Sequence, residues 1–272
     1  MLRVVSVLFV CLCLALPAFA QNRDPEAVRV ANQLMDAMGG KAAFDALPML
    51  GFQFAGERNG EQFFVWSHLW NKYTGDYRVE GTTRDGEVVQ VILNIHDRGG
   101  RAWLNGQLLD GDAALEWVER GYLRFINDSY WALFPWKWLD DGVHLAYEGT
   151  QERDGKSYEV VKLTFDDGTG VTSGDRYWGF VDPETHLLAR WEFVLQNEDG
   201  SPGTDEPTAW AWEDWTEIGG GVKVALTKRK VGAEDGLALT HPRVMLFGPA
   251  DPAVFEPGGP AFENLVPLAH KP

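Results

Sequence analysis

Pairs of turn-forming residues recur along this chain and favour a fold built from antiparallel strands. Asn-Gly or Asp-Gly dipeptides begin at positions 59, 85, 105, 154, 167 and 199. Both dipeptides favour tight two-residue turns, whose twist matches that of antiparallel strands. The segments between them are rich in β-branched and aromatic residues, which is typical of strands. We therefore expect an antiparallel meander with strands at residues 63–70, 88–95, 101–104, 157–165, 176–181, 187–196, 208–217 and 222–231.

A helix is expected before the first strand. Asp24 is a good N-cap residue, and Pro25 fits the first helical position, where its missing N–H is not needed. Apolar residues then recur at helical spacing, and Gly39-Gly40 is typical of a helix end. A second, short helix is expected at residues 41–47, before Pro48.

A helical segment interrupts the meander. Between residues 112 and 134 the apolar positions follow a period of 3.6, which predicts one helix or two helices broken near Gly121 or Asn127. The meander is expected to resume at Val143. The segment from Gly248 onward is rich in Pro and Gly, which predicts a coil on the surface. With no linker, charge block or repeat in the sequence, we expect residues 21–272 to form a single domain.

The first twenty residues have the pattern of a secretory signal peptide. Arg3 precedes an apolar run that is too short to span a bilayer, and Ala18-Phe19-Ala20 forms a cleavage pattern before Gln21. An uncleaved N-terminal anchor is the alternative. Both cysteines, Cys11 and Cys13, lie inside this segment, so cleavage removes every thiol. The exported chain then has no disulfide, no thiolate nucleophile and no cysteine metal ligand.

The charge balance of the mature chain excludes some partners. Loss of Arg3 leaves 23 basic residues against 40 acidic ones, a net formal charge of −17. Such a chain repels nucleic acid and anionic membrane surfaces at long range. We expect a soluble protein of the periplasm, or one that is secreted, without a transmembrane segment. The sequence does not indicate an oligomeric state.

No motif in the sequence points to catalysis, a metal or a cofactor. The histidines lack the spacing of zinc ligands, and no nucleophile elbow or calcium loop is present. Most paired carboxylates precede glycine and belong to turns. Glu213-Asp214 lies within an expected strand, where neighbouring side chains point to opposite faces. We therefore assign no catalytic residue, no metal ligand and no cofactor, although a zinc site assembled from separate strands remains an alternative.

Aromatic residues are the candidates for a binding surface. Trp131, Phe134, Trp136 and Trp138 surround the helix-breaking Pro135, which suggests an aromatic flap that opens when an apolar ligand enters. Ordinary core packing of these rings is the alternative. We expect a flap of this kind to tolerate Phe134→Asp with the meander still folded.

The strands add further aromatic positions. In the expected strand 63–70, the even-numbered residues Phe64, Trp66, His68 and Trp70 lie on one face. If this face points inward, it can hold a lipid on the concave side of the sheet. A sheet covered by its own helices is the alternative. The complete set of expected cavity or lid residues is Trp66, His68, Trp70, Trp131, Phe134, Trp136, Trp138, Trp178, Phe180, Trp191, Phe193 and Trp210.

Several short motifs resemble a known superfamily. They are Gly39-Gly40, residues 131–135 followed by 140–143, residues 158–165, and residues 182–185. Together with the helix, meander and helical insert, they are similar to an uncharacterised exported bacterial branch of the LolA/LolB-like proteins, the bacterial lipoprotein carriers. The resemblance implies a mainly β (α+β) fold: a curved, incomplete antiparallel β-barrel with an N-terminal helix and an inserted helical flap, and a cavity for acyl chains.

The leading functional hypothesis is non-catalytic binding or carriage of a hydrophobic or lipid-like ligand in the periplasm. Its partner is a hydrophobic small molecule or an acyl chain. One alternative is an enzyme that acts on such a molecule, with His68 or a cavity carboxylate as general base. The other is a structural or interaction protein of the cell envelope whose barrel is filled by its own side chains.

Overall fold

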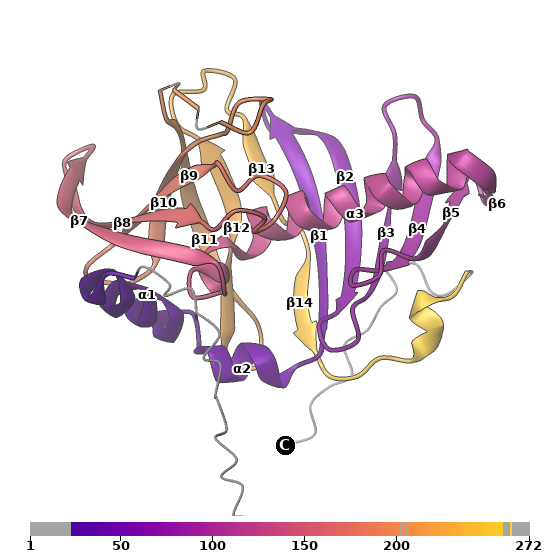
Figure 1. The fold of residues 1–272 in the computed structure, drawn as a ribbon, viewed down its shortest axis with the longest axis horizontal. Coiled ribbons are helices and arrows are strands. Elements are labelled where there is room, and N and C mark those ends of the chain that lie inside the picture. The colour runs from indigo at the N-terminus through magenta and orange to yellow at the C-terminus, as the bar shows by residue number, and fades with distance from the viewer. Residues whose placement is uncertain (1–22, 202, 205, 258–261, 263–272) are drawn as a thin grey trace, which may run out of the picture.

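One open, curved antiparallel sheet dominates the computed structural model of the protein, which describes residues 23–201, 203–204, 206–257 and 262 (Figure 1). The expected signal peptide, residues 1–20, lies outside the described residues. The strands are β1 (Met49–Arg58), β2 (Glu61–Asn71), β3 (Asp76–Thr82), β4 (Val88–Asn94), β5 (Gly100–Leu104), β6 (Gln107–Leu108), β7 (Val143–Arg153), β8 (Lys156–Phe165), β9 (Arg176–Val181), β10 (Leu188–Val194), β11 (Thr208–Gly219), β12 (Val222–Lys230), β13 (Ala238–Thr240) and β14 (Val244–Phe247).

The sheet consists of two meanders, one of strands β1–β6 and one of strands β7–β13. They are joined where β1 pairs with β13. The order across it is β6-β5-β4-β3-β2-β1-β13-β12-β11-β10-β9-β8-β7, and β14 also pairs with β1. Strands that follow each other in sequence are neighbours, except that β6 and β7 lie at opposite edges and that β13 and β14 both pair with β1 and not with each other. The two outer strands, β6 and β7, do not pair with each other, so the barrel is incomplete, as predicted.

Asn-Gly and Asp-Gly pairs form the predicted hairpin turns. Asn59, Asn105 and Asp154 have φ of 53°, 51° and 52°, and the glycine after each also has a positive φ. Two successive residues with positive φ are the signature of the type I′ turn, which joins twisted antiparallel strands. The local sequence therefore determines the β1–β2, β5–β6 and β7–β8 connections.

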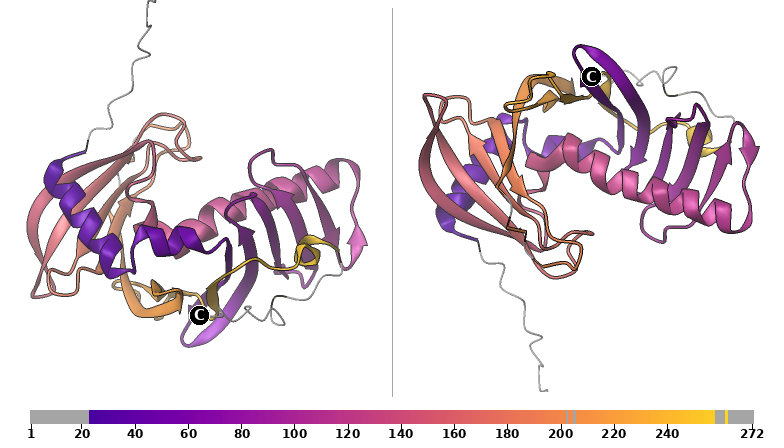
Figure 2. Two further views of the ribbon diagram at one scale, coloured as in Figure 1. Left: turned by 90° about the horizontal axis from the view of Figure 1, so that it is seen from below. Right: turned by 90° about the horizontal axis from the view of Figure 1, so that it is seen from above.

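The helices lie on the inside and at one end of the curved sheet. They are α1 (Pro25–Ala37), α2 (Lys41–Ala46), α3 (Gly111–Leu133) and the short 3₁₀ helix η1 (Phe134–Lys137). As predicted, the Asp24 carboxylate caps α1 by accepting a hydrogen bond from the Glu26 N–H at 2.8 Å. Helix α3 joins β6 to β7, one edge of the sheet to the other, and Figure 2 shows the strands curving around it.

Of the two alternatives predicted for this segment, the single helix is the one observed, because α3 runs through Gly121 and Asn127 without interruption. Gly121 instead allows the helix to approach the sheet closely. A Cβ at this position would lie 2.8 Å from Cγ1 of Val91 on β4, a distance that real Cβ atoms do not adopt. The glycine therefore serves packing rather than a turn.

Three hydrophobic clusters fill the molecule. The large core lies between α1, η1 and the strands β7–β12, and the small core lies between α3 and the strands β2–β5. A third cluster covers the opposite face of β1 and β2, where Val254 of the 3₁₀ helix η2 (Pro252–Phe255) and Phe262 are buried. The segment after Gly248 is therefore not the simple surface coil that was expected, because part of it forms a hydrophobic cover.

The sequence analysis did not identify strands β1, β3, β6, β13 and β14. In β1, seven of the ten residues are buried, because this central strand has packing partners on both faces, so the apolar residues do not alternate. In β3, Arg78 is buried and donates to the Val254 carbonyl at 2.9 Å, so a charge occupies an interior position. Both strands lack the alternating pattern on which the prediction relied.

Candidate functional site

Strand β2 presents a row of large rings to α3. Trp70 meets Phe125 of α3 edge to face, with ring centroids 5.0 Å apart, and the Arg124 guanidinium lies 3.5 Å from the Trp66 ring centroid. Leu69, on the odd face, belongs instead to the cluster under the C-terminal segment. The alternation read from the sequence therefore places Trp66, His68 and Trp70 on the concave face.

The other half of the concave face is a continuous layer of aromatic rings. Trp131 of α3 contacts Trp191 and Trp210 at centroid distances of 4.6 and 4.9 Å. Trp191 is 1% exposed and also contacts Phe193. Of the expected cavity residues, this layer includes Trp131, Phe134, Trp136, Trp138, Trp191, Phe193 and Trp210.

Trp178 and Phe180 lie on the outer face of the sheet, so their assignment to the cavity is corrected. They are opposite Glu192 and Arg190 in the pairing of β9 with β10, whereas Gly179 is opposite Trp191. The guanidinium carbons of Arg153 and Arg190 lie 4.8 and 5.9 Å from the Phe180 ring centroid.

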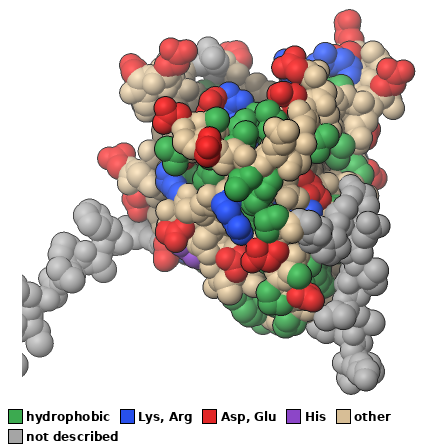
Figure 3. All heavy atoms as spheres, turned by 90° about the vertical axis from the view of Figure 1, so that its right-hand side faces the viewer, with side chains coloured by type: hydrophobic (Ala, Val, Ile, Leu, Met, Phe, Trp, Pro, Cys, Tyr) green, Lys and Arg blue, Asp and Glu red, His purple; other side chains and the backbone are tan. Residues whose placement is uncertain are grey.

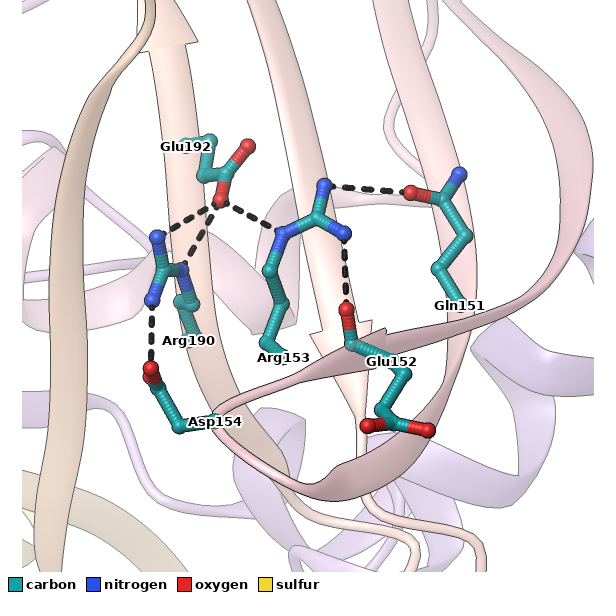
Figure 4. Close-up of polar contacts among 6 residues, drawn as sticks. All are labelled: Gln151, Glu152, Arg153, Asp154, Arg190 and Glu192. Carbon is teal, nitrogen blue, oxygen red and sulfur yellow. Dashed lines mark hydrogen bonds and ion pairs between the residues drawn. The ribbon is translucent and has the colours of Figure 1, made fainter.

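Figure 4 shows how these two arginines are held on the outer face: both donate to Glu192, from Arg153 Nε at 3.3 Å and from Arg190 Nη2 at 2.8 Å. Arginine side chains can cover apolar rings in this way. The inward face of β9 carries Tyr177 and Gly179 instead. A Cβ on Gly179 would lie 2.2 Å from Cζ2 of Trp138, so the glycine provides the space for that indole. The pattern misled the prediction because the larger rings lie on the outside.

The expected flap at residues 134–138 is part of the large core. Phe134 and Trp138 have no exposed surface, and Trp136 stacks on Phe44 of α2 at 4.7 Å. The Trp136 indole N–H donates to the carbonyl of Lys223 at 3.3 Å. These contacts attach η1 to α2 and β12, so these rings are core in the ligand-free structure. Movement of the segment when a ligand enters stays a prediction.

Buried polar side chains of β2, β3 and α3 form a contact between the helix and the sheet. The Tyr77 hydroxyl donates to Nδ1 of His68 at 2.6 Å, and His68 Nε2 faces the Asp128 carboxylate of α3 at 3.3 Å. Arg124 also contacts Asp128, at 3.4 Å. Burial lowers the pKa of His68 below its usual value, although Asp128 opposes this, and burial raises the pKa of Tyr77 well above its usual value.

Two further buried bases continue across the concave face. His68 stacks on Phe52 with ring centroids 4.3 Å apart, and the His241 ring contacts Phe52 edge to face with centroids 6.2 Å apart. Lys228 of β12 is fully buried, donates to the Ala225 carbonyl at 2.6 Å, and lies 4.5 Å from the Trp212 ring centroid. We call His68, His241 and Lys228 the polar strip.

Burial disfavours the charged forms of the side chains in the polar strip. Burial lowers the pKa of Lys228 well below its usual value. Burial also lowers the pKa of His241 well below its usual value, and the neighbouring charges of Lys228 and His68 act in the same direction. His241 Nδ1 donates to the Gln53 carbonyl at 2.9 Å, which leaves Nε2 without a hydrogen-bond partner among the described residues.

Many donors on the concave face also lack acceptors. Among the described residues, five buried indole N–H groups have no hydrogen-bond partner, those of Trp70, Trp138, Trp191, Trp210 and Trp212. An unsatisfied buried polar group costs about 1–3 kcal/mol. The concave face is therefore rich in donors and poor in acceptors, which is the opposite of the acidic surface of the protein. Neither Lys228 nor His241 was identified from the sequence as a site residue.

Acidification is expected to destabilise the fold as the pH falls below about 6.5, the usual pKa of histidine. His68 and His241 have lowered pKa values when folded, so at such pH the unfolded chain binds protons that the folded chain does not. Replacing His241 with Phe should weaken the pH dependence of the unfolding free energy by up to about one proton between pH 7 and 5. Urea unfolding at several pH values measures this effect.

His96→Gln is the control for that measurement, because His96 is exposed. The control should keep the wild-type pH dependence. If His241→Phe and the wild type showed the same dependence, burial of a neutral His241 would be disproved.

Acidic and hydrophobic side chains share the surface at one end of the molecule. Figure 3 shows this end, where hydrophobic patches lie between Asp and Glu side chains. Leu115 and Leu123 of α3 are 69% and 45% exposed. Within the described ranges, no helix combines the length and the apolarity that crossing a membrane requires. The described residues also contain no group of three or more His, Asp or Glu side chains that could hold a metal ion.

The chain is similar in fold to several solved structures. One is a DUF1329 family protein from Desulfovibrio piger, with 14% identity and a TM-score of 0.46, covering 85% of this chain and 97% of that one. Another is a LolA superfamily protein from Nitrosomonas europaea, with 12% identity and a TM-score of 0.44, covering 84% and 96%. A third is the lipoprotein LppX from Mycobacterium tuberculosis, with 15% identity and a TM-score of 0.29, covering 63% and 89%.

No protein-family model and no curated protein matches the chain. The open barrel with its crossing helix has the architecture that the sequence resemblance implied.

Proposed function

We propose that the protein binds a hydrophobic or lipid-like molecule without catalysis, on the concave face of the sheet beneath α3. The single observation that carries this proposal is the composition of that face. It combines a continuous aromatic layer with unsatisfied buried donors, and a single helix bridges its two halves. A ligand with an apolar body and a few acceptor atoms would complement both features.

The two ends of α3 are attached to the sheet to different degrees. At the C-terminal end, Ala132 and Leu133 are 3% and 4% exposed and are followed directly by the buried Phe134. In the N-terminal half, Val118 and Phe125 are 8% and 9% exposed, and the other rings of this half are only partly buried. A ligand would therefore displace the N-terminal half first, with the C-terminal end as the pivot.

The closed arrangement should dominate in the absence of ligand. Lifting the N-terminal half of α3 exposes the apolar side chains of the small core, at a cost of about 25 cal/mol for each Å². An acyl chain would replace this contact and recover much of that energy. The proposal therefore needs no large preformed cavity. A pocket at Arg78, Glu80 and Phe262, on the opposite side of the sheet, is too small for a water molecule.

Hydrogen exchange tests the movement of α3. In the free protein, residues 111–126 should exchange faster than residues 130–138, because fewer of their side chains are fully buried. Saturating laurate should change the exchange of residues 111–126 and shift the tryptophan emission, while residues 134–138 remain protected. Acetate, which has the same head group without the chain, is the control.

The test also separates the alternatives. If no long-chain ligand changed exchange or emission, the binding proposal should be replaced by the structural one, in which the barrel is filled by its own side chains. The observation that favours this structural alternative is that the aromatic rings of the concave face pack against one another. Turnover of a bound ester would favour an enzyme, with His68 and Asp128 as the nearest acid–base pair.

We also propose that the protein is exported and acts in the periplasm as a single half-barrel domain. The expected cleavage before Gln21 supports this proposal. Intact-mass measurement of the exported form should show the loss of residues 1–20. A mass that retained Met1 to Ala20 would show instead that the segment remains as an anchor.

A further inference from the structure

Lys228 is an unusual residue to find in the interior of this protein. It has no exposed surface, and among the described residues no Asp or Glu forms an ion pair with it. The Ala225 carbonyl accepts one hydrogen bond from its amine, and the Trp212 ring supplies a weak cation–π contact. A buried amine with so few partners costs folding energy, whereas a methionine would fill a similar volume without that cost.

The surroundings of Lys228 can supply further donors. The indole N–H groups of Trp210 and Trp212 have no acceptor among the described residues, and Trp212 is directly opposite Lys228 in the pairing of β11 with β12. Nε2 of His241 is also without a partner, and it becomes a donor if the ring is protonated. The two indoles therefore lack an acceptor, Lys228 has the Ala225 carbonyl as its one acceptor among the described residues, and His241 would need an acceptor for Nε2 once its ring is protonated.

The acidic charge of the whole protein contrasts with the group of buried basic and donor side chains around Lys228. A net formal charge near −17 after cleavage repels anions at long range. Several surface basic side chains, such as Arg29 with Glu26 and Glu159, are paired with carboxylates. Lys228 lacks such a pair, and it lies on the aromatic face on which the proposed function places an acyl chain.

We propose that Lys228 and His241, with the indoles of Trp210 and Trp212, bind the acidic head group of an anionic amphiphile such as a fatty acid. This proposal rests on the proposed function and names the class of its ligand. The carboxylate accepts from the Lys228 ammonium, from protonated His241 and from the indole N–H groups. The acyl chain lies along the rings beneath α3, in contact with Trp66 and Trp70.

Binding of an acid would also remove the penalty that the closed arrangement carries. A carboxylate next to Lys228 and His241 favours the charged forms of both side chains, because opposite charges attract strongly in a low-dielectric interior. Hydrogen bonds to a charged group are also stronger than those between neutral groups. A neutral ester of the same chain length gains the apolar contacts but not these interactions.

The experiment compares laurate with methyl laurate by isothermal titration calorimetry. Wild-type protein should bind laurate at least about tenfold more tightly than the ester, a difference of about 1.4 kcal/mol. Lys228→Met should bind both compounds with similar affinity. The matched control is Lys162→Met, because Lys162 lies on the outer face near Trp178. This control should keep the wild-type preference.

Each outcome has a separate meaning. Equal binding of acid and ester by the wild type, or an unchanged preference in Lys228→Met, would overturn the head-group proposal and leave the proposed function standing. Binding of neither compound would overturn the proposed function, and the head-group proposal with it. His241→Phe provides a second variant: its preference for laurate should be reduced, and circular dichroism shows whether each variant is folded.

Discussion

Replacing Phe134 with alanine should lower the free energy of unfolding by about 3–5 kcal/mol, the usual cost of removing a buried phenylalanine ring. Phe134 has no exposed surface and lies where α3 passes into η1. Its ring contacts five other aromatic rings, those of Tyr130, Trp138, Tyr177, Trp191 and Trp212. Urea unfolding followed by circular dichroism measures the loss.

Phe63→Ala is the matched control, because Phe63 is 50% exposed and should lose less than about 1 kcal/mol. If Phe134→Ala cost as little as the control, residues 134–138 would be a loosely held flap and not part of the core. The structure predicts the opposite, and it also predicts that Phe134→Asp unfolds the large core, because a carboxylate would be buried there without a partner.

Replacing Lys228 with methionine should raise the free energy of unfolding by about 1–3 kcal/mol at pH 7, the usual cost of an unsatisfied buried polar group. Stabilisation is the unusual direction, because most substitutions of buried residues destabilise a protein. The difference between variant and wild type should become smaller as the pH rises toward 10.5, the pKa of an exposed lysine.

The sign of that trend follows from proton binding. Below pH 10.5 the unfolded wild type holds a proton on Lys228, whereas burial lowers the pKa of the folded state well below that value. Acidification from pH 10.5 therefore favours the unfolded wild type, while the methionine variant has no such group. Lys162→Met should leave stability within about 0.5 kcal/mol. A Lys228→Met variant less stable than the wild type would show that the amine is stabilised by partners in the folded protein.

Much of the sheet could be predicted from local sequence. The turn dipeptides and the alternation on β2 correctly located hairpins and placed Trp66, His68 and Trp70 on one face. Alternation failed on β9, because Trp178 and Phe180 are covered from outside by charged side chains, which no periodicity can reveal. The β1–β13 pairing joins residues that are far apart in the chain, so local pattern carries no information about it.

The sequence analysis did not predict Lys228 and His241 of the polar strip as site residues. Lys228 continues the inward face of Val222, Val224 and Leu226 on β12, and this departure from an apolar face is a signal that could have been noticed. His241 has no comparable signal, because it follows the short strand β13 and becomes important only where β1 and β12 approach each other.

The central claim is that the concave face beneath α3 receives an acyl chain, and photo-crosslinking tests it most directly. A long-chain fatty acid with a diazirine on its chain would be bound, irradiated and mapped to single residues by mass spectrometry. The account predicts labelling of Trp66 and Trp70 on β2 and of the inward side of α3, and its suppression by excess laurate. Labelling confined to outward residues such as Val65 and Trp178, or labelling that laurate does not suppress, would contradict the account.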